Sequence, residues 1–88
     1  MPTIAIFFGI IVQMYWRDHN LPHIHAWYQG QEALVAIETG EVIAGSLPKP
    51  VARLMRERVL LRQSELMENW ERGRQQEPFE QVPGADQQ

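Results

Sequence analysis

Residues 15–28 read Tyr-Trp-Arg-Asp-His-Asn-Leu-Pro-His-Ile-His-Ala-Trp-Tyr, and the interpretation of the whole 88-residue chain starts from this stretch. It contains all three histidines of the protein, together with a turn that Pro22 marks. Aspartate and asparagine are turn formers, and a proline pushes the residue before it into an extended conformation. The stretch therefore predicts one strand before the turn and a second strand, residues 23–28, after it.

The segments on either side complete the prediction of an α+β fold. An apolar lead-in, either strand or short turn, covers residues 3–8, and strands are predicted at 10–16, 23–28, 32–37 and 42–46 with short turns between them. Residues 49–72 have a helix-forming composition, with prolines suited to the first turn and Gly73 at the end. We expect an antiparallel meander of about four strands with one long C-terminal helix packed on it. Residues 1–75 form this single domain, and residues 76–88 form a flexible polar tail.

The helical segment has an unusual face, because Arg58 and Arg62 fall between two apolar flanks. Two interpretations are open. In the first, either a break near Gln63 and Ser64 shifts the phase of the apolar face, or the arginine side chains extend past the edge of the sheet into solvent. Alternatively, the arginines reach toward a site that they share with the histidines.

Composition and charge exclude several classes of protein. The chain has no cysteine, which excludes disulfides and thiolate metal sites and agrees with a cytoplasmic protein. The apolar run at residues 4–12 is too short to span a membrane, so we expect no membrane association. The net charge of −3 argues against a general nucleic-acid binder, although residues 49–63 hold five basic residues against one acidic residue. A local contact with nucleic acid therefore remains open.

The histidine pair predicts a candidate site. His23 and His25 are two residues apart on a predicted strand, so both imidazoles and the Trp27 ring project from the same face. Imidazole is a common ligand of transition metals, and Asp18 or His19 would supply a third ligand and leave an open coordination position. We expect no cofactor; the alternative is a divalent transition metal held by His23, His25 and Asp18.

The same residues allow two readings without a metal. His23 and His25 would act as general acid and base in a ribonuclease-type hydrolase, with Arg17, Arg58 or Arg62 stabilising the developing charge and Trp27 stacking on a base. In the structural alternative, the histidines form hydrogen bonds with turn backbone while the tryptophans fill the core.

Several segments together resemble the bacterial domain-of-unknown-function family DUF4160, over residues 1 to about 75. They are Met1-Pro2-Thr3-Ile4, Phe7-Phe8-Gly9-Ile10, Asp18-His19-Asn20, Pro22-His23-Ile24-His25 and Glu68-Asn69-Trp70-Glu71-Arg72. The resemblance implies a small bacterial protein without an established activity, often encoded beside a second small protein in a layout similar to toxin–antitoxin pairs. The site residues that it implies are Asp18, His19, His23 and His25. This chain departs from the family pattern at Leu21, Arg58 and Arg62.

We therefore expect a small binding or regulatory protein, one half of a two-gene toxin–antitoxin-like module. Its expected partner is a small protein encoded by a neighbouring gene, with nucleic acid as a second class of partner. The expected binding residues are Arg17, Asp18, His19, Trp27, Arg58 and Arg62. A histidine-dependent hydrolase and a transition-metal-binding protein are the alternatives.

Overall fold

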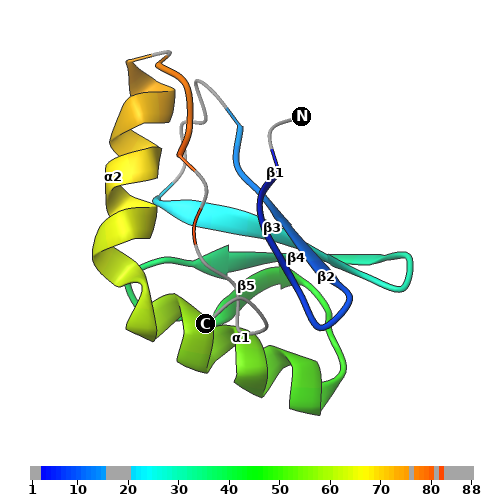
Figure 1. Cartoon of the computed structure of the whole chain (residues 1–88). Helices are drawn as coiled ribbons and strands as arrows, with labels where there is room; N and C mark the ends of the chain where they lie inside the picture. Colours follow the sequence, from blue (N-terminus) through cyan, green and yellow to red (C-terminus); the bar gives the residue numbers. More distant parts are fainter. Residues whose placement is uncertain (1–2, 16–20, 76, 81, 83–88) are drawn as a thin grey trace.

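The structure, a computed structural model, describes residues 3–15, 21–75, 77–80 and 82, and it confirms the α+β class (Figure 1). The strands form one antiparallel sheet in the order β1-β2-β3-β4-β5. The elements are β1 (Thr3–Phe7), β2 (Ile10–Gln13), β3 (His23–Tyr28), β4 (Gln31–Ala36), β5 (Val42–Gly45), α1 (Lys49–Leu61) and α2 (Gln63–Arg74). The prediction of about four strands and one long helix is therefore corrected to five strands and two helices within the described part of the chain.

The additional strand is β1, which a two-residue turn at Phe8 and Gly9 connects to β2. Phe8 and Gly9, between β1 and β2, have φ values of 50° and 76°. Gln29 and Gly30, between β3 and β4, have nearly the same values, 48° and 80°. Positive φ at both central residues is the signature of a two-residue turn whose twist matches that of the flanking strands. Residues 3–8 are too uniformly apolar to show the alternation of a half-exposed strand, which is why β1 was ambiguous.

The helical segment breaks at Arg62, which has φ −109° and ψ 25° and lies between α1 and α2. The side chain of Gln63 donates hydrogen bonds to the carbonyl oxygens of Ile37 and Glu38, at 2.9 and 2.7 Å. These bonds hold the break against the loop after β4. The break lies near Gln63, where one of the open interpretations of this segment places it, and it lets α1 and α2 bury different faces.

The core lies between the helices and one face of the sheet, and α1 crosses that face (Figure 1). Residues paired across an antiparallel ladder point to the same side of the sheet, so the register assigns each residue to a face. The core face carries Ile10, Val12, Ile24, Ala26 and Val35, all fully buried. The opposite face, called the open face below, carries Ile6, Ile11, Gln13, His25, Trp27, Glu32, Leu34 and Ala44.

The C-terminal segment, meaning residues 77–80 and 82, runs back from the end of α2 toward β1 (Figure 1). The backbone N–H of Val82 donates to the carbonyl oxygen of Ile4 at 2.8 Å, and the Val82 side chain is buried. The flexibility of residues 76–88 stays a prediction, but this part of them has a defined path. Neither described helix is long and apolar enough to cross a lipid bilayer.

Candidate functional site

Both described histidines belong to a row of rings at the end of the sheet where β3 begins. The ring centroids of Tyr15 and His25 are 4.3 Å apart, those of His25 and His23 are 5.2 Å apart, and those of His23 and Trp70 are 5.2 Å apart. The strand period of two brings the two histidines to the same side, as predicted. The break at Arg62 directs α2 so that Trp70 closes the row.

His23 lies at the inner end of this row and is only 2% exposed. Its Nδ1 is 2.7 Å from the carbonyl oxygen of Leu21. A carbonyl can only accept, so Nδ1 carries the proton and the ring is held in one orientation. This is the hydrogen bond to turn backbone that the structural alternative for the histidines describes.

His25 has a different environment, because its Nδ1 is 2.9 Å from Oε2 of Glu32 on the neighbouring strand. The carboxylate accepts the proton of Nδ1, which fixes the tautomer and orientation of the ring. The two side chains are 16% and 36% exposed, and they line a small pocket of about 240 Å³ on the open face beside Leu34 and Ala44. His25 is thus an oriented imidazole that is largely buried, with its Nε2 shielded from solvent, whereas His23 is fully enclosed.

Glu32 was not predicted as a site residue, although a signal for it exists in the sequence. The Gln29-Gly30 turn pairs Tyr28 with Gln31 and Trp27 with Glu32. Residues of one face that are diagonal across a ladder lie within reach of long side chains. A correct turn assignment would therefore have placed Glu32 next to His25.

An apolar row crosses the open face beside this histidine–glutamate pair. Ile6, Ile11, Trp27 and Glu32 are successive cross-strand partners on β1, β2, β3 and β4. Ile6 is 52% exposed and Ile11 is 40% exposed, while Trp27 is partly buried. Trp27 and Ile11 also line a hollow of about 400 Å³ with Gln13 and the two adjacent turns. The structure thus places Trp27 on the same face as His25, as the sequence predicted.

The remaining predicted site residues fall into two groups, those outside the described part of the chain and the two arginines of the helical segment. Arg17, Asp18 and His19 lie outside the described residues, so the metal set of His23, His25 and Asp18 remains a prediction. Within the described ranges, no group of three or more His, Asp or Glu residues has the arrangement of a metal site.

The two arginines of the helical segment have other contacts. The guanidinium of Arg58 lies 5.8 Å from the ring centroid of Phe7, which belongs to the core. Nη1 of Arg62 lies 3.2 Å from Oε1 of Glu65, one turn along in α2. Neither of these two contacts involves a histidine, and a site shared by the arginines with His23 and His25 stays a prediction.

Comparison with known proteins identifies a family. The model of the family described as "Domain of unknown function (DUF4160)" matches residues 9–71, which is more than half of the chain. The chain therefore belongs to this family, as the sequence motifs indicated. No curated protein and no solved structure matches it.

Proposed function

We propose, from its membership of the DUF4160 family, that this chain is a small binding and regulatory protein that docks a partner protein on the open face of its sheet. The observation that carries the proposal is the apolar row formed by the exposed Ile6 and Ile11 and the partly buried Trp27. The partner is a small protein encoded by a neighbouring gene, in a bacterial two-gene module of the toxin–antitoxin kind that works in the cytoplasm.

The composition of the open face suits protein binding. Contiguous exposed apolar side chains are unfavourable in water, and such patches with polar rims mark interaction surfaces. Here the apolar row is flanked by Gln13, His25 and Glu32, which supply hydrogen-bonding groups at its border. A tryptophan among smaller apolar side chains is the residue type that most often dominates binding energy. Trp27 is therefore the expected anchor.

The test is co-expression of the full chain with the neighbouring gene product, followed by calorimetric titration of the purified pair. Ile11→Lys places a charge in the middle of the row and Trp27→Ala removes the anchor. We expect each to weaken binding by about 30-fold or more, because losing a hot-spot contact at the centre of an interface costs about 2 kcal/mol or more.

The matched control is Leu61→Lys, which changes an apolar side chain that is 64% exposed at the end of α1. It should bind like the unmodified chain. Absence of any complex would refute the proposal. So would an Ile11→Lys variant that binds no more weakly than the Leu61→Lys control.

A histidine-dependent hydrolase is the second candidate, and the 2.9 Å contact between His25 and Glu32 favours it. A carboxylate that orients an imidazole prepares that ring to act as a general base. The hydrolase would arrest growth when expressed, and Glu32→Gln or His25→Ala would relieve the arrest while leaving the fold intact. Continued arrest with both variants would eliminate this candidate.

A further inference from the structure

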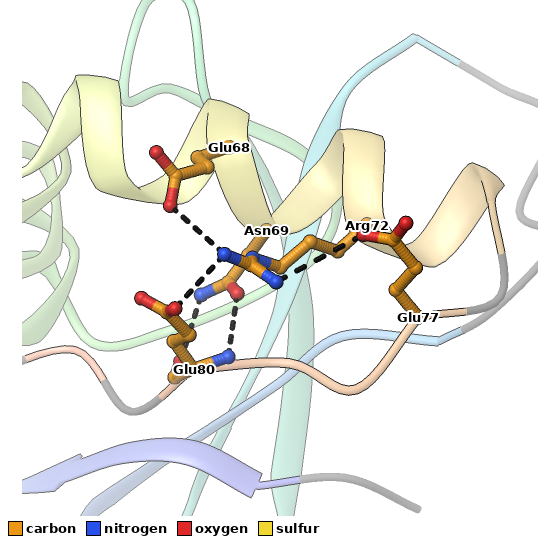
Figure 2. Close-up of polar contacts among 5 residues, drawn as sticks. All are labelled: Glu68, Asn69, Arg72, Glu77 and Glu80. Atoms are coloured by element: carbon orange, nitrogen blue, oxygen red, sulfur yellow. Dashed lines mark hydrogen bonds and ion pairs between the residues drawn. The ribbon is translucent and has the colours of Figure 1, made fainter.

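The two edges of the sheet differ in how their main-chain groups are paired. At the β1 edge, the N–H of Val82 donates to the carbonyl oxygen of Ile4 at 2.8 Å. The C-terminal segment is fastened to α2 two residues earlier. There the Asn69 side chain donates to the carbonyl oxygen of Glu80 at 2.9 Å and accepts from its N–H at 2.8 Å (Figure 2). Nη2 of Arg72 also lies 2.9 Å from Oε1 of Glu80 (Figure 2). The protein thus covers part of its own β1 edge.

The β5 edge lacks this cover. β5 is the last strand in the sheet order and pairs with β4 alone. Among the described residues, no main-chain group outside the sheet donates a hydrogen bond to residues 42–45 or accepts one from them. The strand carries neither a charged residue nor a proline, the residue types that usually protect an exposed edge. The register shift between Leu34 and Val35 leaves Ile43 without a partner on β4, and its side chain is 45% exposed. This edge can therefore accept another extended chain.

A pocket lies between the start of β5 and α1, and we call it the basic pocket. Its volume is about 280 Å³, and its lining consists of Gly40, Glu41, Val42, Ala52, Arg53 and Arg56. The helix comes this close because Gly40 has no side chain. A Cβ there would lie 3.0 Å from Cγ and 3.1 Å from Cα of Arg56. The turn after β4 thus holds two arginines of α1 beside the first residue of β5.

The positive charge of the basic pocket is only weakly neutralised. Nε of Arg56 lies 3.5 Å from Oε1 of Glu41, but the two side chains are 57% and 61% exposed, so solvent screens this ion pair. Arg53 is exposed and forms no ion pair with any residue that the structure describes. The lining holds two guanidinium groups against one carboxylate, so the pocket attracts a further carboxylate.

We propose that residues 42–45 together with Arg53 and Arg56, called the edge site below, bind an acidic peptide segment of a partner protein in extended conformation. The main chain of the peptide pairs with the outer edge of β5 and adds a strand to the sheet. Its carboxylates pair with the two arginines of the basic pocket. The inference concerns a different surface from the open face and does not depend on the proposed function.

The geometry of the edge site sets the spacing of the acidic residues. Side chains of an added strand point alternately to the two faces of the sheet, so residues two apart face the side that α1 covers (Figure 1). Their Cα atoms lie about 6.6 Å apart, and Arg53 and Arg56 are separated by about 4.5 Å along the axis of α1. Long arginine side chains bridge this difference. Two acidic residues with one apolar residue between them are therefore the expected sequence.

Two other occupants suit the edge site less well. A nucleic acid has no alternating N–H and carbonyl groups to pair with β5, and the net charge of −3 opposes the approach of a polyanion. A second copy that paired its β5 antiparallel to this one would bring both basic pockets to the same side of the joined sheet, which like charges oppose. An acidic peptide has neither disadvantage.

NMR titration of the full-length chain with a capped peptide, Ser-Glu-Val-Glu-Val-Glu-Ser, tests the proposal. We expect the amide signals of Val42, Ile43 and Ala44 to shift, and hydrogen exchange in β5 to slow because its outward N–H groups gain acceptors. A peptide with glutamine in place of each glutamate lacks the charge. A peptide with proline in place of each valine keeps the charge but lacks main-chain donors. Both should bind about fivefold more weakly or less tightly still.

Two results of this titration would overturn the proposal. One is the absence of shifts in β5 with the glutamate peptide at millimolar concentration. The other is a proline peptide that binds as tightly as the glutamate peptide, because binding would then not involve strand addition.

Variants of the chain test the role of the arginines. Arg53 and Arg56 are exposed, so an Arg53→Gln/Arg56→Gln variant should keep its fold. We expect it to bind the glutamate peptide about tenfold more weakly than the unmodified chain. The matched control is Arg74→Gln, which removes the same charge from the end of α2, where Arg74 is 62% exposed and pairs with Glu71. Equal binding by the double variant and this control would overturn the proposal.

Two further titrations identify the other occupants. A single-stranded oligothymidine that shifts the edge-site signals at lower concentration than the glutamate peptide, in the same salt, would make this a nucleic-acid site. Shifts in β5 that appear when the protein alone is concentrated would identify a second copy. Either result would overturn the assignment to an acidic peptide, whereas silence in both titrations beside a response to the glutamate peptide would support it.

Discussion

Replacing His23 by alanine tests whether this histidine is held in the protein by its structural contacts. The ring is 2% exposed, lies against the rings of His25 and Trp70, and donates a hydrogen bond to the Leu21 carbonyl oxygen. Truncation of large buried side chains to alanine costs about 2–5 kcal/mol, and a small polar ring belongs at the low end, about 2–3 kcal/mol. The hydrogen bond adds about 1 kcal/mol. We therefore expect the free energy of unfolding to fall by about 3–4 kcal/mol.

The loss is large for a domain of this size. A change of 1 kcal/mol moves the melting temperature of a domain of 60–100 residues by about 4–8 °C, so His23→Ala should lower it by about 12–30 °C. Circular dichroism during heating and urea unfolding measures both quantities. Small domains are only marginally stable, and this variant would lose a considerable part of the total.

His25→Ala is the matched control, because it removes the same kind of ring from the more exposed position beside Glu32. We expect a smaller loss of about 1.5–2.5 kcal/mol, because the ring makes one hydrogen bond and contacts the rings of Tyr15 and His23 but stays partly exposed. If His23→Ala costs less than about 1 kcal/mol, or less than His25→Ala, the assignment of His23 to the core is wrong. The comparison also identifies His25→Ala as the variant suited to the growth-arrest test, since its effect is not confounded by unfolding.

Two further predictions concern the stability of the protein: one compares two glycines with positive φ, and the other removes the Gln63 side chain. Gly45 has φ +73°, and a Cβ there would overlap the carbonyl oxygen of Glu32, whereas Gly30 has φ +80° with open space around it. In urea unfolding, Gly45→Ala should therefore lower the free energy of unfolding by about 3 kcal/mol or more, and Gly30→Ala by only about 1 kcal/mol. Equal losses for the two variants would contradict the predicted overlap. Gln63→Ala removes two hydrogen bonds at the helix break, so it should lower the free energy of unfolding by about 1–2 kcal/mol and speed amide hydrogen exchange at the start of α2. If neither quantity changes, the break does not depend on this side chain.

Local sequence patterns determined much of the fold. The proline and turn formers before residue 23 separated two strands, and the alternation after it placed His23, His25 and Trp27 on one side of the sheet. These features depend on backbone restriction and on the two-residue period of a strand, which act between near neighbours. The α+β class and the antiparallel order followed from the same local signals. The pattern at β1 was ambiguous because a uniformly apolar run shows no strand alternation. The pattern around Arg62 was ambiguous because its apolar residues fit either one helix or two helices with different buried faces.

Tertiary structure alone decided the chemical environment of the site. The strand spacing places His23 and His25 on the same side and does not distinguish them. In the structure, the ring of His23 packs against Trp70, whereas the ring of His25 is oriented by Glu32. The contact with Trp70 joins residues 47 positions apart, and that between Val82 and Ile4 joins the two ends of the chain. Burial and hydrogen bonding depend on everything that packs around a group, so a pattern of near neighbours cannot fix them.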